Sequence, residues 1–331
     1  MVVHQRELSI LGLEAEALLH VYRQMRTIRE LEEALIGLVS QGKLPGFLHL
    51  YAGEEAVAVG VCAHLDDGDF VNSTHRGHGH CIAKGVGVRG MIAELFGRST
   101  GTCKGKGGSM HIADLDRGMV GANGIVGAGI PLTTGAALTL QDKRTRGVSV
   151  GFFGDGATNQ GSFHESLNLA KVWNLPAVYV IENNLYGEAS PMEFVTAVTD
   201  LARRGAAYDI PTAVVDGMDF FAVHEEAGRA IERARQGGGP TLLECKTYRF
   251  YGHYVGDPMT YRSKEETEEW RRRDPLLRFA ARVTEAGVLG DDELRRVDAE
   301  ARDEIAAAVA AAEQDPYPDA AEVSTDVYVQ P

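Results

Sequence analysis

The sequence predicts an α/β fold, with a mainly parallel sheet that carries helices on both faces. Short apolar runs alternate with helical segments from about residue 68 onward, which is typical of strand–helix–strand units. The 331 residues are enough to bury a sizeable core. Because neither a Ser/Pro-rich linker nor an internal repeat divides the chain, we expect one domain over 1–331 with helical extensions at both ends.

The N-terminal extension is predicted as a helix over about 13–42. Apolar residues recur there at helical spacing, charged residues lie between them, and Gly42 follows the last of them. A second helix is expected in "GEEAVAVGVCAHL", which starts at Gly53. The C-terminal extension, about 264–331, is charged and alanine-rich, which indicates two or three surface helices.

Between these extensions, strands and helices are expected to alternate along the chain. The apolar runs that we interpret as strands are 148–153, 177–182, 212–215 and 241–247. The intervening segments that we interpret as helices are 161–173, 199–208 and 219–236. This alternation is the basis for expecting parallel strands.

Composition excludes several classes of protein. A formal net charge of −14 argues against nucleic-acid binding, which usually needs a basic face. No apolar stretch is long enough to span a membrane, and the N-terminus lacks the layout of a signal peptide, so we expect a cytoplasmic protein. The four cysteines form no CxxC pair, which favours reduced thiols.

The stretch "VSVGFFGDGATNQG" ends an apolar strand in Gly154, Asp155 and Gly156. The next strand ends at Asn184, 29 residues further on, so a right-handed crossover places both strand ends at one edge of the sheet. Carboxylate and amide oxygens suit Mg²⁺, which is usually bound together with substrate phosphates. Either segment alone could be an ordinary turn. The pair predicts a metal that holds a diphosphate.

These residues resemble the thiamine-diphosphate motif, and the chain around them is similar to the alpha subunits of heterotetrameric 2-oxo acid dehydrogenases. The resemblance covers about 15–275. Within the family, the segments "LYAGEEAVAVGVCAHL" and "THRGHGHCIAKG" are most similar to the alpha subunits of acetoin dehydrogenases. Other matching segments, in order, are "GFLHLYAGEEA", "STHRGHGH", "GRSTGTCKGKGGSMHIAD", "GANGIVGAGIP" and "TYRFYGHYVGDP". The resemblance implies a thiamine-diphosphate-binding fold.

The resemblance implies two groups of residues at the diphosphate. Mg²⁺ would be held by Asp155, Asn184 and the backbone carbonyl of Tyr186. The diphosphate would be neutralised by Arg76, whose guanidinium suits phosphate oxygens, and contacted by the backbone of Gly154, Gly156 and Ala157.

At the reactive end of the cofactor, the resemblance implies that Gly124 and Val126 hold its aminopyrimidine in a bent shape. His49, His75 and His253 match positions that line the diphosphate and the substrate, and they are the catalytic candidates; His75 and His253 are also cofactor-binding candidates. A zinc site in "HRGHGH" is the weaker alternative because Arg76 opposes a dication, and His78 and His80 are expected to be structural.

The resemblance also implies partners. This chain offers only the diphosphate-binding half, so a beta subunit would supply the glutamate that protonates the cofactor ring, in an α₂β₂ heterotetramer. The helix "GIPLTTGAALTL" at 129–140 is assigned to that interface, or alternatively to the core. A lipoyl-bearing acyltransferase would receive the two-carbon product.

The implied activity is cleavage of acetoin to acetaldehyde and a cofactor-bound two-carbon unit. The alternative substrate is pyruvate or another 2-oxo acid; pyruvate-specific relatives have tyrosine where this chain has His75. Two other classes stay open: a nicotinamide enzyme, if a strand precedes the GxGxxG match "GVGVRG" at 85–90, and a non-catalytic subunit. Tyr254 replaces the regulatory serine of animal relatives, and 248–262 is expected to be a mobile loop that orders over the cofactor.

Overall fold

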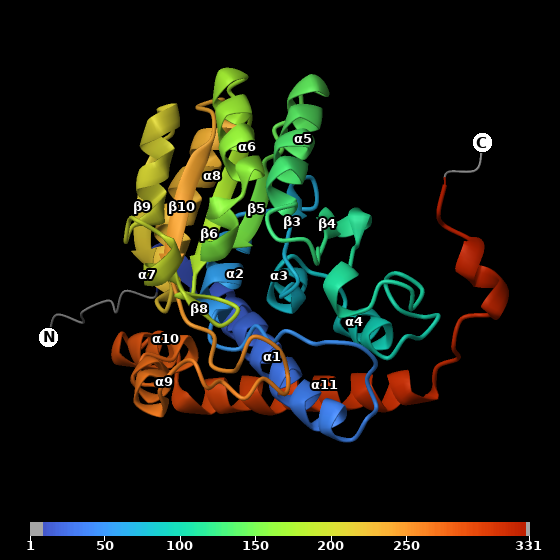
Figure 1. The fold of residues 1–331 in the computed structure, drawn as a ribbon. Helices are drawn as coiled ribbons and strands as arrows, with labels where there is room; N and C mark the ends of the chain where they lie inside the picture. The colour runs from blue at the N-terminus through green and yellow to red at the C-terminus, as the bar shows by residue number, and fades with distance from the viewer. Residues whose placement is uncertain (1–8, 329–331) are drawn as a thin grey trace, which may run out of the picture.

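A six-stranded parallel sheet forms the centre of the molecule in the computed structural model, which describes residues 9–328. The strand order is β4-β3-β5-β6-β10-β9, and every neighbouring pair is parallel (Figure 1). The strands are β3 (Phe70–Asn72), β4 (Met119–Gly121), β5 (Ser149–Gly154), β6 (Ala177–Asn183), β9 (Thr212–Asp216) and β10 (Thr241–Lys246). The predicted parallel α/β fold is confirmed.

Alternate residues along each central strand enter different hydrophobic clusters. On β5, Val150 and Phe152 join one cluster, whereas Phe153 joins the other. On β6, Val178 and Tyr179 divide in the same way. Successive side chains of a strand point to opposite faces, so each cluster lies on one face of the sheet. Burial on both faces explains why these strands are continuous apolar runs.

Helices cover both faces of the sheet, as predicted. The cluster that contains Phe153 is completed by α5 (Gly129–Asp142), α6 (Gly161–Val172) and the 3₁₀ helix η4 (Leu201–Tyr208). The cluster that contains Phe152 is completed by α2 (Glu55–Cys62), α8 (Phe220–Arg235) and the terminal helices. The segment 199–208 was expected to be a helix; the structure places a helix there, over Leu201–Tyr208, but of the 3₁₀ type.

The helical extensions pack together beneath the sheet in Figure 1. The N-terminal helix α1 (Ala15–Ser40) contacts α11 (Asp291–Gln314), and Tyr22 Oη donates a hydrogen bond to Asp298 Oδ1 at 2.9 Å. The C-terminal extension contains three α-helices, which agrees with the expected two or three; the other two are α9 (Lys264–Arg271) and α10 (Pro275–Glu285). The predicted start at residue 13 was early, because Leu13–Glu14 form β2 and pair with β1 (Ser9–Ile10).

Short elements complete the described chain. These are α3 (His78–Ala83), α4 (Val88–Leu95), α7 (Met192–Val195), the β7–β8 hairpin (Tyr186–Gly187 and Ser190–Pro191) and the 3₁₀ turns η1 (Ser109–His111), η2 (Leu115–Arg117), η3 (Asp155–Asn159) and η5 (Ala320–Ser324). The GxGxxG match at 85–90 begins in the turn after α3 and ends in the first turn of α4. Because a helix precedes it where a nucleotide fold needs a strand, the nicotinamide alternative is wrong. Within residues 9–328, none of the helices is both long and apolar enough to cross a membrane.

Candidate functional site

A cavity of about 310 Å³ opens at the carboxyl edge of the sheet. Its lining comes from the loops that follow β3, β5, β6 and β10, together with the segment before α5 and Glu54 at the start of α2. Ligands of open parallel sheets bind at this edge. The cavity therefore lies where the strand order predicts a binding site.

Asp155 contributes a carboxylate to this cavity directly after β5. The residue is 2% exposed, and its Oδ2 is buried without a hydrogen-bond partner. Burial raises the pKa of the carboxyl to about 6, although backbone hydrogen bonds and Arg249 oppose this shift. A buried acceptor without a partner is costly. This carboxylate is suited to a bound cation.

Asn184 directly follows β6, Tyr186 begins β7, and both line the same cavity. Asn184 Nδ2 donates to Glu54 Oε1 at 2.9 Å, which fixes the orientation of the amide, and its Oδ1 accepts from Tyr186 N at 3.3 Å. The carbonyl of Tyr186 accepts from Arg249 Nη1 at 3.2 Å and has a second lone pair free for another partner. The structure thus brings the three predicted oxygen donors to one cavity.

Two buried guanidinium groups face the cavity. Arg76 is 3% exposed and donates to the carbonyls of Leu50 and His253. Its pKa is lowered to about 10 by burial, so it remains charged near neutral pH. Arg249 is 1% exposed and donates to the carbonyls of Tyr186 and Glu188. Two such cations make the cavity suitable for an anion, although the net charge of the chain is negative.

The backbone at Gly154 and Gly156 is bare where it meets the cavity. A Cβ at Gly154 would contact nothing within 4 Å, and one at Gly156 would approach only Gly187 Cα, at 3.8 Å. Both glycines and Ala157 line the cavity. Without side chains in the way, backbone N–H groups at this turn can approach phosphate oxygens closely.

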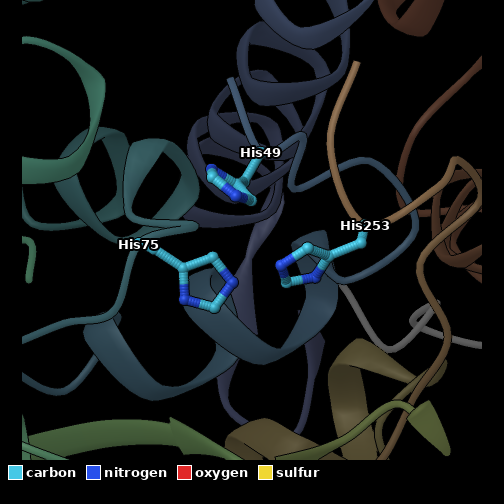
Figure 2. A group of neighbouring side chains, drawn as sticks. All are labelled: His49, His75 and His253. Carbon is cyan, nitrogen blue, oxygen red and sulfur yellow. The ribbon is translucent and has the colours of Figure 1, made fainter. Parts of the chain in front are cut away.

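The side chains of His49, His75 and His253 lie close together (Figure 2), and two of them, His75 and His253, line the cavity. One ring nitrogen of each lies within 4.8 Å of the others, and the ring centroids of His49 and His75 are 4.6 Å apart. Burial, followed by the charge of Arg76, lowers the pKa of His49 to about 3, of His75 to about 2 and of His253 to about 4. All three imidazoles are therefore neutral at physiological pH.

The other two histidines of "HRGHGH" have separate partners. The ring of His78 contacts Glu32 at 3.0 Å and Ser109 at 2.8 Å. The ring of His80 contacts Ser73 at 2.7 Å and Glu182 at 2.9 Å. These contacts hold the segment after β3 in place. Both rings therefore have the structural role that was expected of them.

Not every predicted residue reaches the cavity wall. Val126 lines the cavity, whereas Gly124 and His49 are absent from its lining. A Cβ at Gly124 would instead lie 3.7 Å from Met110 Sδ, and the ring of His49 contacts those of His75 and His253, with centroids 4.6 and 5.0 Å away. The roles assigned to these three positions stay predictions.

Sequence reasoning missed Glu54, Glu182 and Arg249. Burial, followed by repulsion from Glu182, raises the pKa of Glu54 to about 8, and its Oε2 lies 3.7 Å from Arg76 Nε. Arg249 lies in "TYRFYGHY", four positions before His253, but nothing local distinguishes it from a surface arginine. These three residues become visible only when β6, β10 and α2 are assembled.

Comparison with known proteins gives a consistent result. The family model described as "Dehydrogenase E1 component" matches residues 23–321. The alpha subunit of acetoin:2,6-dichlorophenolindophenol oxidoreductase from Bacillus subtilis (strain 168) is 57% identical, with 96% of each chain covered, and its counterpart from Cupriavidus necator is 55% identical, with 97% of each covered. The alpha subunit of pyruvate dehydrogenase E1 from Rhizobium meliloti is 44% identical over 93% of this chain and 89% of the relative.

Proposed function

The chain belongs to the dehydrogenase E1 component family, and from this premise we propose that it is the alpha subunit of a thiamine-diphosphate-dependent acetoin dehydrogenase. The family's members are oxidoreductases that depend on thiamine diphosphate. Acetoin is proposed as the substrate because the two relatives with 57% and 55% identity are named for it and cover nearly the whole chain.

The observation that carries the cofactor assignment is the buried, unpartnered Oδ2 of Asp155 in a cavity that also holds two buried guanidinium groups. A lone buried carboxylate and two buried cations would each be costly in an empty cavity. A Mg²⁺ ion would compensate the carboxylate and a diphosphate would compensate the two guanidinium groups, so the residues fit the cofactor. When bound, thiamine diphosphate supplies the nucleophilic carbon for the reaction.

We assign roles to the chain's own residues accordingly. Asp155, Asn184 and the Tyr186 carbonyl hold the metal, a donor set typical of Mg²⁺. Arg76 and Arg249 neutralise the diphosphate. The amides of Gly156 and Ala157 donate hydrogen bonds to its oxygens.

The three histidines are proposed to handle the substrate. Their neutral rings each offer one donor and one acceptor, which suits the hydroxyl and carbonyl oxygens of an uncharged hydroxyketone. Arg76 and Arg249 disfavour the protonated form of these rings. We therefore assign these three residues to positioning the substrate, because a neutral ring can hydrogen-bond its hydroxyl or carbonyl oxygen without taking up a proton.

A beta subunit is the expected partner, because this chain is the alpha subunit of a multi-subunit enzyme. We place part of the interface on α5 and the turn before it, where Ile125, Val126 and Leu132 are each about half exposed or more. Apolar side chains exposed together mark interaction surfaces. The α₂β₂ stoichiometry, a lipoyl-bearing acyltransferase acceptor and the cytoplasmic location belong to this proposal.

Co-expression with the beta subunit, followed by reduction of an artificial electron acceptor in the presence of thiamine diphosphate and Mg²⁺, tests the function. We expect turnover with acetoin to exceed turnover with pyruvate. Loss of both activities in Asp155→Ala, with the complex intact, would tie turnover to the metal site. An intact complex that uses neither substrate would contradict the proposal.

Pyruvate is the second candidate substrate. The 44% identical Rhizobium meliloti relative is named for pyruvate dehydrogenase, and Arg76 and Arg249 offer positive charge to a substrate carboxylate. Turnover dominated by pyruvate would leave the fold and the cofactor assignment in place and reassign the substrate.

A further inference from the structure

We propose that the 3₁₀ helix η4 is a positioning element for the metal site, although it lies outside the cavity. Arg204, on this helix, holds the turn that begins with Asp155. Glu244, on β10, links the helix to the turn that carries Asn184. Arg204 and Glu244 are not among the residues that line the cavity, so they act through the two turns and not by contact with the metal. This inference rests on the proposed function, because it concerns the Mg²⁺ site assigned there.

Arg204 closes the far end of η3, the turn whose first residue is Asp155. Its Nη1 donates to the carbonyl of Thr158 and, at 3.0 Å, to Thr158 Oγ1, and its Nη2 donates to Asn159 Oδ1 at 2.9 Å. The hydroxyl of Thr158 donates in turn to the carbonyl of Asp155 at 2.7 Å. Because Thr158 is fully buried, these hydrogen bonds are shielded from water. A chain of hydrogen bonds therefore runs from Arg204 to the backbone of the metal-binding residue.

A guanidinium group suits this position. The last carbonyls of a short helix have no partner within the helix itself. The planar guanidinium of Arg204 presents several donors in a fixed geometry, so it satisfies a carbonyl, a hydroxyl and an amide oxygen together. Hydrogen bonds from an ionised donor are stronger than those between neutral groups. The turn is thus held more firmly than its own few backbone bonds allow.

Glu244 acts in the same way on the turn after β6. Its carboxylate is fully buried, and it accepts from Asn183 Nδ2 at 2.7 Å and from the backbone amide of Ala202, on η4, at 2.8 Å. Asn183 Oδ1 accepts in turn from Leu185 N at 3.2 Å. Asn184 lies between these two bonded residues, so its backbone is held on both sides.

The two sets of contacts meet on one rigid element. Ala202 and Arg204 are two positions apart on η4. The element is packed tightly at Gly205, where a Cβ would lie 2.5 Å from Thr212 Cγ2. Partners that orient metal ligands typically change metal affinity 10- to 100-fold when they are removed. We therefore assign to η4 the role of fixing the two oxygen donors relative to each other.

The first test measures binding of Mn²⁺, used as a paramagnetic probe for Mg²⁺, to the co-expressed enzyme with thiamine diphosphate. Bound Mn²⁺ loses its sharp solution resonance, so the affinity follows from the free signal. Arg204→Met removes the donors and keeps an unbranched side chain. Arg203→Met, at the exposed neighbouring position of η4, is the matched control. We expect an affinity at least about 10-fold weaker in Arg204→Met and unchanged in Arg203→Met. Arg204→Lys, which keeps the charge but loses the planar fork, should lie between them.

The second test measures hydrogen exchange of the full chain without metal or cofactor. In Arg204→Met, the amides of 156–160 should exchange at least about 10-fold faster, while those of β6 keep their wild-type rates. Faster exchange in β6 as well would show that Arg204 only stabilises the fold, and would overturn the inference. Equal Mn²⁺ affinities of Arg204→Met and Arg203→Met, with tight binding in the wild type, would overturn it and leave the proposed function in place. A wild-type enzyme that binds no Mn²⁺ with thiamine diphosphate would overturn both.

Discussion

At the scale of single residues, Asp155 shows how the site trades stability for binding. Its carboxyl group is almost fully buried and its Oδ2 has no partner. Burial raises its pKa from the ordinary value of 3.8 to about 6. The ionised form thus costs stability, and a bound metal would recover that cost.

Replacing Asp155 with Asn should therefore stabilise the metal-free chain at pH 8. A folded pKa of about 6 against 3.8 unfolded makes ionisation costly by about 3 kcal/mol above pH 6, and the cost disappears below about pH 4. Thermal unfolding at pH 8 and pH 4, without metal or cofactor, measures the gain. It should be present at pH 8 and absent at pH 4. Asp303→Asn, at an exposed position on α11, is the control and should leave the thermal stability unchanged at both pH values. A destabilised Asp155→Asn chain at pH 8 would contradict the assignment.

The sequence was informative for residues that end strands and uninformative for residues that meet through tertiary contacts. Asp155 and Asn184 follow buried runs at the spacing of one crossover, so their shared edge could be predicted. Glu54 and Arg249 reach the same cavity from α2 and from beyond β10. Only the assembled sheet brings them there.

At the scale of elements, Glu94 at the end of α4 organises the glycine-rich segment that follows it. Its fully buried carboxylate accepts hydrogen bonds from four backbone amides, those of Cys103, Gly105, Gly107 and Gly108, at 2.8–3.0 Å. The many glycines between Gly97 and Gly108 permit this close wrapping; a Cβ at Gly101 would lie 2.3 Å from Glu94 Oε2. The glycine density thus has a structural explanation here, in addition to any role at the cofactor.

Glu94→Gln should lower the free energy of unfolding by about 3 kcal/mol. The amide nitrogen of glutamine would face backbone donors, so at least one buried pair of hydrogen bonds to a charged acceptor is lost. Urea unfolding followed by circular dichroism provides the value. Glu304→Gln, at an exposed position of α11, should change it by less than about 0.5 kcal/mol. Equal stabilities of the two variants would show that Glu94 does not hold the segment.

The segment 248–262 is attached at several points in the structure. Phe250 N donates to the Ala52 carbonyl and Val255 N to the Leu48 carbonyl, each at 2.9 Å, and Arg262 donates to the carbonyls of Arg249 and Tyr251. We predict that cofactor and Mg²⁺ slow tryptic cleavage after Arg262, because Arg249 and His253 of this segment line the cavity. Cleavage at the same rate with and without cofactor would remove support for ordering of the loop.

The elements themselves were largely predictable. Runs such as 177–182 are apolar on both faces, which marks a central parallel strand, and β6 covers Ala177–Asn183. The short strands β3 and β4 were not assigned ranges, since three residues give no periodicity. The 3₁₀ form of η4 depends on packing against β9 and β10, which local propensity does not contain.

At the scale of the whole molecule, the chain leaves apolar surface exposed beside its site. Ile125, which lines the cavity, is 71% exposed, and Leu132, on the same helix as the cavity residue Gly129, is 48% exposed. The N-terminal part of α5 thus joins the cavity to the outer surface. A partner that packs on this surface would also close the cavity.

Leu132→Glu should weaken association with the beta subunit at least about 10-fold, corresponding to about 1.4 kcal/mol, because it places a charge in an apolar contact. Leu277→Glu is the matched control, since Leu277 is 65% exposed on α10. Analytical ultracentrifugation of the co-expressed subunits gives both affinities. If both substitutions weaken association equally, or neither does, the interface lies elsewhere.

The most direct test of the account is equilibrium binding of thiamine diphosphate to the assembled enzyme, with Mg²⁺ and with EDTA, for the wild type and Asp155→Ala. The account predicts tight binding only in the wild type with Mg²⁺, and weak binding in the other three combinations. Unchanged affinity in Asp155→Ala with Mg²⁺ would show that the carboxylate at the end of β5 does not hold the metal, and would contradict the central claim.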